Sequence, residues 1–335
     1  DMPSRAVLDL SIALSDNENT RPLIEGRVTP EAIRLTPTVV HPSEMFWRQL
    51  KFAEFDVSEM SLSSLLIAAS RGPTDWVAIP VYTMRRFFHT GIMVRTAAGI
   101  RTPADLRGKK VGVPEYQQTA AIWIRGILED EFGVRPQDIE WFMERTPERS
   151  HGGATGFTPP AGVRINQIPA STNIGQMMVS GALDATLLYL NDRNAVDRSR
   201  VDLDAEPSVA FLFADPAAEC RRYYAKTRLH PINHTLVVRR DVAERDPTLA
   251  RRIFDAFVAA KADARRTAAG VLQPYFDTGQ MDGSAAQAFA NDPMAYGVRP
   301  NRRILETVAG YVQRQGLLAR PVALEEVFAP EMLDV

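Results

Sequence analysis

The chain has one cysteine, Cys220, among its 335 residues, and no excess of basic charge. A single cysteine cannot form a disulfide within the chain or a cysteine-based metal cluster. The formal net charge is −2 and no lysine or arginine cluster stands beside aromatic residues, so we expect no nucleic-acid partner. No apolar run reaches the roughly 18 residues of a membrane-spanning helix, so we expect no membrane insertion.

Several catalytic signatures are also missing. The pair Gly152-Gly153 does not follow a strand with the spacing of a phosphate or dinucleotide loop, and no Gly-x-Ser-x-Gly segment occurs. No lysine stands out as a Schiff-base candidate for pyridoxal chemistry. His230 and His234 are four residues apart, but Pro231 intervenes and disrupts the helical spacing of a metal pair. The sequence therefore predicts no cofactor and no metal ligands, although it leaves a need for a divalent ion open.

The chain alternates strand-like and helix-like segments, which is typical of an α/β protein. Its length suits two domains of roughly 100–200 residues each. Apolar residues predict strands at Val7–Leu14, Phe55–Met60, Trp76–Tyr82, Val111–Val113, Val163–Ile168, Ala185–Tyr189, Val209–Phe213 and Thr235–Val238.

Helices are predicted from their caps and their periodicity. One begins near Thr119 and ends before Gly133, and another runs from Ile174 to Gly181. Asn301 is expected to cap the last long helix. The Gly- and Pro-rich segment Ser150–Gly162 is predicted to be a loop. Further helices are expected to begin at Ser43 and at Asp246-Pro247.

The order of these segments predicts a discontinuous domain. Residues 91–200 form an expected second lobe, inserted between residues 1–90 and 201–335 of the first lobe. The chain then crosses twice between the lobes, which predicts a hinge and a ligand cleft in which helix N-termini converge.

Three segments gather polar groups at predicted strand ends. In Asp56–Ser61, Glu59 is either a cleft carboxylate or an ordinary polar residue at a strand terminus. In Pro80–Thr90, Arg85 and His89 suit a carboxylate ligand, because guanidinium binds carboxylate with two hydrogen bonds. The alternative is that the arginines of this segment form salt bridges at the hinge.

The third segment, Glu115–Thr119, opens a helix that carries Arg125. Its backbone N–H groups and the Thr119 hydroxyl are placed to hold an anion at the helix start. Arg125 either reaches the cleft or lies on the helix surface.

A set of motifs distributed over nearly the whole chain resembles the 4,5-dihydroxyphthalate decarboxylase family. The motifs are Pro22–Val28, Phe55–Ser61, Ile79–Val81 with Arg85 and His89, Val111–Gln117 with Thr119, Trp123 and Arg125, Pro231-Ile232 with His234, Tyr296–Val298 with Asn301-Arg302, and Glu325–Glu331. The resemblance implies a two-lobed periplasmic-binding-protein-like (type II) fold. It also implies cofactor-independent decarboxylation of a hydroxylated aromatic mono- or dicarboxylate.

The family pattern is altered at two places. The family tends to carry a second arginine just before the histidine, where this chain has Phe88, and the loop Ser150–Gly156 lacks the family's acidic residues. Both places are expected to contact substrate, so the identity of the aromatic acid stays open.

The resemblance and the chemistry together suggest the roles of the site residues. Decarboxylation needs a proton donor at the ring carbon, a group that orients the ring hydroxyl, and cationic anchors for carboxylates. The expected catalytic residues are His89 or His234 as the acid, and Glu59 or Glu115 as the orienting carboxylate. The expected substrate-binding residues are Arg85, Arg125, Thr119, Tyr116 and Ser61.

The same cleft also suits a binding protein that delivers a small carboxylate to an ABC-type transporter. Asp1 precedes Met2, which resembles an added residue before a native start and favours a cytoplasmic protein, although a chain whose leader had been removed would look similar. A periplasmic location would accompany the transport alternative. The family resemblance also suggests a homo-oligomer.

Overall fold

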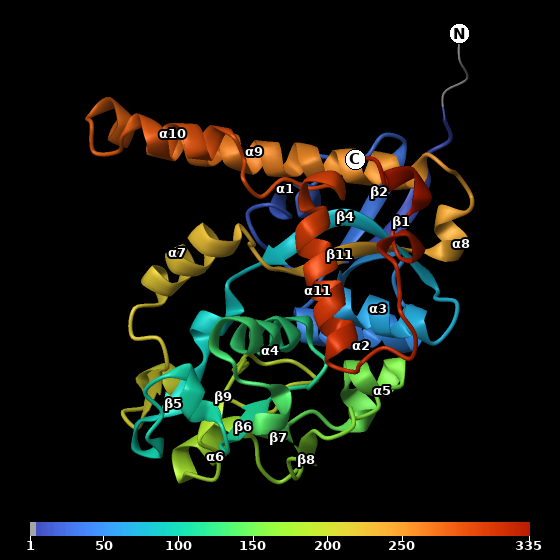
Figure 1. Cartoon of the computed structure of the whole chain (residues 1–335). Coiled ribbons are helices and arrows are strands. Elements are labelled where there is room, and N and C mark those ends of the chain that lie inside the picture. Colours follow the sequence, from blue (N-terminus) through green and yellow to red (C-terminus); the bar gives the residue numbers. More distant parts are fainter. Residues whose placement is uncertain (1–4) are drawn as a thin grey trace.

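The computed structural model describes residues 5–335 and contains two mixed β-sheets (Figure 1). The first sheet has the order β2-β1-β3-β11-β4, with β1 (Leu8–Leu14), β2 (Ile33–Val39), β3 (Val57–Ser61), β4 (Trp76–Arg85) and β11 (Ile232–Arg239). The second sheet has the order β10-β5-β9-β6-β7-β8, with β5 (Met93–Arg95), β6 (Lys110–Val113), β7 (Glu140–Met143), β8 (Arg164–Gln167), β9 (Ala185–Thr186) and β10 (Val209–Phe211).

The pairing of the strands decides where loops can meet. Strands β1, β2 and β3 run parallel to one another, whereas β11 is antiparallel to both β3 and β4. The residues that follow β1, β2 and β3 therefore lie at one edge of the first sheet, which is the usual ligand side of such sheets.

Helices cover both sheets. They are α1 (Arg21–Ile24), α2 (Pro42–Phe52), α3 (Leu62–Ser70), α4 (Thr119–Phe132), α5 (His151–Thr155), α6 (Ile174–Ser180), α7 (Pro216–Thr227), α8 (Arg240–Ala243), α9 (Leu249–Asp277), α10 (Gly283–Ala290) and α11 (Arg302–Arg314). The first part of α9 packs on one face of the first sheet, and its end projects from the body together with α10 (Figure 1).

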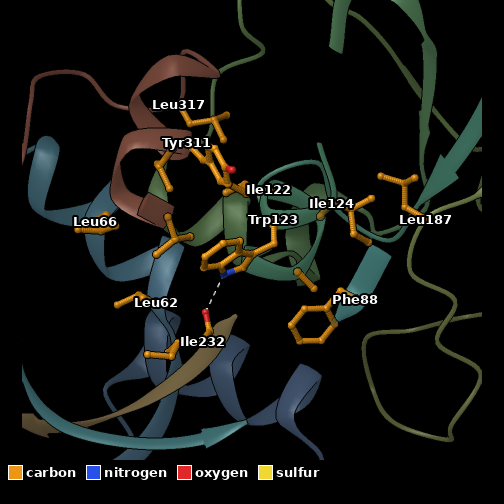
Figure 2. Packing of buried hydrophobic residues seen from close by; sticks show 14 of the residues in the cluster. Leu62, Leu66, Phe88, Ile122, Trp123, Ile124, Leu187, Ile232, Tyr311 and Leu317 are labelled. Carbon is orange, nitrogen blue, oxygen red and sulfur yellow. Dashed lines mark hydrogen bonds between the residues drawn. The ribbon is translucent and has the colours of Figure 1, made fainter. Parts of the chain in front are cut away.

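A shared core joins the two lobes. Trp123 on α4 is fully buried, and its indole N–H donates a hydrogen bond to the carbonyl oxygen of Ile232 on β11, 2.9 Å away (Figure 2). Its ring also meets Tyr311 of α11 edge-on, with centroids 5.6 Å apart. Helix α4 follows β6 of the second sheet, whereas β11 is a strand of the first sheet. This packing therefore fixes the lobes against each other.

Most predicted elements are present, although several bounds and caps differ. The segment Ser150–Gly162 contains the short helix α5, which forms because the Ser150 hydroxyl accepts a hydrogen bond from the N–H of Gly153 at 2.7 Å. The strand predicted at Ala185–Tyr189 has only two residues. Asn301 precedes α11 but makes no side-chain cap, because its amide binds Arg85 and two carbonyl groups.

Two further observations concern the organisation of the chain. Strand β10 pairs with β5 in the second sheet, so the second sheet uses residues up to Phe211. The division into 1–90 plus 201–335 and 91–200 stays a prediction. Across residues 5–335, no helix is both long enough and apolar enough to cross a membrane.

Candidate active site

A cavity of about 390 Å³ lies between the lobes. Its first-lobe wall comes from the residues that follow β1, β2 and β3 and from β11, and includes Ser15, His41, Ser43, Phe46, Ser61 and His234. Its second-lobe wall includes Gln118, Thr119, Arg145, His151, Leu188 and Leu190. The parallel strands explain this convergence, because Ser15, His41 and Ser61 follow or end neighbouring strands at one sheet edge.

One part of the wall is rich in hydrogen-bond donors. The hydroxyls of Ser61 and Thr119 are 2.9 Å apart, and the backbone N–H of Ser63 donates to the Thr119 hydroxyl at 2.9 Å. The start of α3 thus meets the start of α4. The first N–H groups of α4 have no acceptor within the helix, so this end attracts an anion.

Apolar side chains form another part of the wall. The Phe46 ring meets His234 edge-on at a centroid distance of 4.6 Å and His151 at 5.7 Å. Phe88, Leu188 and Leu190 also face the cavity. This surface suits the flat face of an aromatic ring.

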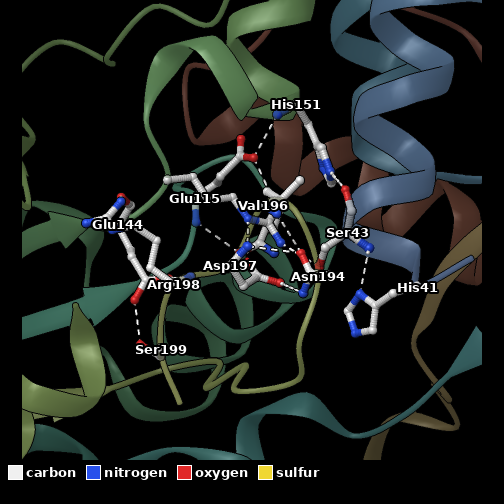
Figure 3. Close-up of polar contacts among 12 residues, drawn as sticks. His41, Ser43, Glu115, Glu144, His151, Asn194, Val196, Asp197, Arg198 and Ser199 are labelled. Atoms are coloured by element: carbon white, nitrogen blue, oxygen red, sulfur yellow. Dashed lines mark hydrogen bonds and ion pairs between the residues drawn. The ribbon is translucent and has the colours of Figure 1, made fainter. Parts of the chain in front are cut away.

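A buried ionic cluster supports the second-lobe wall (Figure 3). Arg145 donates to Asp197 at 2.8 Å, to Glu115 at 3.0 Å and to the Ser43 hydroxyl at 2.8 Å, and the three charged side chains are fully buried. Burial alone would raise the pKa of Glu115, but His151, Arg145 and the backbone N–H groups of residues 151 and 152 together lower it. One guanidinium here serves two carboxylates, so each nitrogen of Arg145 already has a partner and its charge is compensated within the cluster.

The cavity histidines are held in defined orientations. His151 donates from Nε2 to the Ser43 carbonyl at 2.8 Å, and the Asn233 amide donates to Nε2 of His234 at 3.0 Å. Burial, with smaller effects of His151 and His41, lowers the pKa of His234 to about 3. Burial also lowers the pKa of His151. Both imidazoles are therefore uncharged near neutral pH.

Strand β11 has register shifts on both sides of His234 in its pairing with β4. An irregularity of this kind redirects a side chain and is common beside active sites. The irregularity explains how His234, on the buried strand β11, reaches the cavity.

Comparison with known proteins identifies the family. No family model matches the chain. The chain is 32% identical over 332 residues to the 4,5-dihydroxyphthalate decarboxylase of Comamonas testosteroni, which covers 98% of both chains. This chain belongs to the 4,5-dihydroxyphthalate decarboxylase family. A relative of the same name from Pseudomonas putida is 32% identical over 217 residues, which covers 65% of this chain and 81% of the relative.

Solved structures confirm the expected fold. The aliphatic sulphonate binding protein SsuA of Escherichia coli has a TM-score of 0.53 at 13% identity, over 99% of this chain and all of that chain. The alkanesulfonate-binding protein SsuA of Xanthomonas axonopodis pv. citri has a TM-score of 0.52 at 13% identity, over 98% of both chains. This decarboxylase-family chain therefore has the two-lobed periplasmic-binding-protein-like fold, and at such low identity the likeness concerns the fold alone.

The structure brings three of the predicted site residues together. Ser61, Thr119 and His234 all line the cavity. Two more lie one layer behind its wall, because Glu115 pairs with Arg145 and Glu59 accepts hydrogen bonds from Ser15. The roles predicted for these five residues in the decarboxylase stay predictions.

Arg85 has other partners. It donates to the side-chain oxygen of Asn301 and to the carbonyl of His230, each at 3.0 Å. Side chains alternate along a strand, so Met84 and Arg86 face the cavity whereas Arg85 points away. The exposed guanidinium of Arg86 takes the place that we expected for Arg85.

His89, Tyr116 and Arg125 also lie outside the cavity wall. His89 is fully buried, with Nε2 3.1 Å from the Glu219 carboxylate, and burial lowers its pKa. Arg125 stacks 3.6 Å from the centre of the Tyr116 ring. Arg125 lies six residues after Thr119, about 240° around the helix, so its side chain faces the interior behind α4.

Phe88 and His151, at the two places where the family pattern is altered, line the cavity. Sequence reasoning missed other residues of the cavity wall, namely Ser15, His41, Arg145 and Asn233. Ser15 directly follows the strand predicted at Val7–Leu14, and this position was a usable signal for it. Within residues 5–335, no group of three or more His, Cys, Asp or Glu side chains is arranged to hold a metal ion.

Proposed function

We propose that this member of the family removes CO2 from a hydroxylated aromatic carboxylate bound in the interlobe cavity. The observation that carries the proposal is the pairing of a donor-rich wall, formed by Ser61, Thr119 and the start of α4, with an apolar wall that includes Phe46 and Phe88. The family relationship supports the same reaction. The cavity volume of about 390 Å³ lies at the small end of the roughly 300–1,000 Å³ range of ligand pockets and suits a single ring.

The chemistry explains why both walls are needed. Loss of CO2 leaves an electron pair on a ring carbon unless that carbon is protonated first. A hydroxyl para to the carboxylate supplies electrons to the ring and becomes positively polarised, so polar groups that accept its hydrogen bond lower the barrier. The leaving carboxylate is activated where the wall is apolar, because it loses hydration there while the product CO2 is neutral.

The polar residues have separate proposed roles. The donors at Ser61, Thr119 and the start of α4 bind a ring hydroxyl or a second carboxylate. Arg86 supplies positive charge at the cavity wall. His234, held by Asn233, acts as an uncharged hydrogen-bonding group, since an imidazole with a pKa of about 3 is not an imidazolium acid at neutral pH.

A substrate panel tests the proposal. The purified protein is incubated with phthalate, hydroxylated phthalates and hydroxybenzoates, and CO2 and the shortened aromatic product are measured. We expect release only from acids with a ring hydroxyl para to a carboxylate. Thermal stabilisation by these acids without any CO2 release would contradict a decarboxylase and favour a binding protein.

The expected cytoplasmic location and homo-oligomeric state stay predictions. Fractionation of the source cells tests the first, and light scattering of the purified protein tests the second.

A further inference from the structure

One buried acid near the cavity has no counter-ion. Glu59 lies on β3 near the middle of the first sheet and is fully buried. Its hydrogen-bond partner is Ser15, whose hydroxyl lies 3.0 Å from Oε1 and 2.8 Å from Oε2 and whose backbone N–H also donates to the carboxyl group. In the part of the chain that the structure describes, no lysine or arginine pairs with Glu59.

Ser15 connects this acid to the cavity. It follows β1 directly and lines the cavity wall. Ser15 therefore contacts Glu59 through its hydroxyl and also forms part of the cavity wall. A hydroxyl accepts one proton while it donates another, which makes it a suitable relay group.

The surroundings favour the protonated form of Glu59. Burial raises its pKa, and the nearby hydroxyls of Thr83 and Ser15 offset only part of this effect. The groups that face it are the hydroxyls of Ser15 and Thr83 and the phenol of Tyr296. The Thr83 hydroxyl is buried and has no hydrogen-bond partner among the described residues, so a protonated carboxyl nearby would supply a donor that this hydroxyl lacks.

The two buried histidines of the cavity wall do not supply this proton, since burial keeps His151 and His234 uncharged. The proposed reaction nevertheless consumes one proton per turnover. We infer that Glu59 is a neutral carboxylic acid that delivers, through the Ser15 hydroxyl, the proton that replaces the carboxyl group on the aromatic ring. This inference rests on the proposed function.

In this step a hydrogen atom replaces the carboxyl group on the ring. The O–H bond of Glu59 breaks and its proton passes to the Ser15 oxygen, while the original Ser15 proton moves to the ring carbon that bears the carboxylate. A ring electron pair forms the new C–H bond. The C–C bond to the carboxylate then breaks, its electron pair restores aromaticity, and CO2 leaves. Glu59 is left as a carboxylate and regains a proton from water.

Two pairs of variants test the relay. Glu59→Gln keeps the shape but cannot release a proton, and Glu144→Gln is its control, because Glu144 is also buried and bonded to a serine, Ser199, but lies away from the cavity. Ser15→Ala removes the relay hydroxyl, whereas Ser15→Thr keeps one. We expect kcat to fall about 100-fold in Glu59→Gln with KM little changed. Ser15→Ala should lose kcat in the same way, Ser15→Thr should retain more kcat than Ser15→Ala, and Glu144→Gln should resemble the wild type.

Two readouts separate a proton donor from a structural acid. Infrared spectra at pH 7 should contain a protonated carboxyl band that is absent from Glu59→Gln and present in Glu144→Gln. The wild-type kcat should also fall as pH rises through the pKa of Glu59, and the residual activity of Glu59→Gln should lack this fall.

The outcomes are distinct. Absence of the carboxyl band in the wild type, or full kcat in Ser15→Ala, would overturn the relay while leaving the decarboxylase intact. If the wild type releases no CO2 from any acid of the panel, the proposed function itself fails, and the infrared band then shows only a stored proton.

Discussion

At the scale of single residues, burial decides the charge of the cavity histidines. We expected His234 to titrate near neutral pH, as free imidazole does. In the folded protein its pKa is lowered to about 3, first by burial and then by the neighbouring histidines. His234 is therefore a neutral hydrogen-bonding group in the folded protein and not the acid that we expected.

The first prediction follows from this difference. The unfolded chain binds a proton at His234 below about pH 6.5, whereas the folded protein does not, so the free energy of unfolding falls as pH decreases from 6.5 towards 3. The contribution of His234 amounts to about 2 kcal/mol lost at pH 5. Urea unfolding at pH 7 and pH 5 should show that His234→Gln lacks this part of the loss. An equal loss in both proteins would contradict the low pKa.

Arg86 carries the second prediction. Its exposed guanidinium lines the cavity, whereas the charge of Arg145 is compensated by Asp197 and Glu115. Arg86→Ala should therefore raise KM for an aromatic acid about tenfold, equivalent to about 1.4 kcal/mol of binding. Arg34→Ala is the matched control, because Arg34 is exposed on β2 and pairs with Asp9. An unchanged KM in Arg86→Ala would show that the anion binds elsewhere in the cavity.

At the scale of elements, α4 is the most constrained helix. Its start contributes Thr119 to the cavity, and its middle packs Gly126 directly against the ring of Tyr311 on α11. A Cβ atom at Gly126 would lie well inside contact distance of that ring. The glycine is therefore required by close approach of two helices.

The third prediction tests this packing. Gly126→Ala should destabilise the protein by about 1–3 kcal/mol, because the helices must separate or Tyr311 must move. Gly270→Ala is the control, since Gly270 lies on α9 with open space around it, and alanine there should stabilise by up to about 1 kcal/mol. Chemical denaturation of both variants measures the difference. Equal effects would mean that helix propensity dominates at both sites.

The start and end of α4 were predictable because they depend on local signals. Helical spacing of apolar residues begins at Thr119, and Gly133 adopts the left-handed conformation that ends the helix, with φ of 67°. The orientation of Arg85 could not be predicted from the sequence. Its neighbour Arg86 is chemically equivalent, and only the direction of β4 relative to the cavity distinguishes the two.

At the scale of the whole molecule, the lobes are joined at the cavity as well as in the core. Arg145 and His151 of the second lobe both bind Ser43 at the start of α2. Trp123 adds the buried hydrogen bond to β11. A ligand between the lobes therefore contacts residues that already hold them together.

The fourth prediction concerns coupling of the lobes. An aromatic acid at 100 times its Kd should add about 2.7 kcal/mol to the free energy of unfolding, because it binds the native state alone. Since its contacts come from both lobes, calorimetry should show one transition that moves as a unit. Acetate, which lacks the ring, serves as the control. A shift confined to one of two separate transitions would contradict binding between the lobes.

The α/β class, most strands, α4 and the family follow from sequence alone, because periodicity, capping residues and motif spacing are local properties of the chain. Only the tertiary structure decides which side chains line the cavity, because distant segments must fold together to form it. It includes Ser15, His41, Ser61, Thr119 and His234, and it excludes Arg85, His89 and Arg125. The protonation states of Glu59 and His234 belong to the same category. A pKa responds to burial and to neighbours in space, and neither is written in the order of the residues.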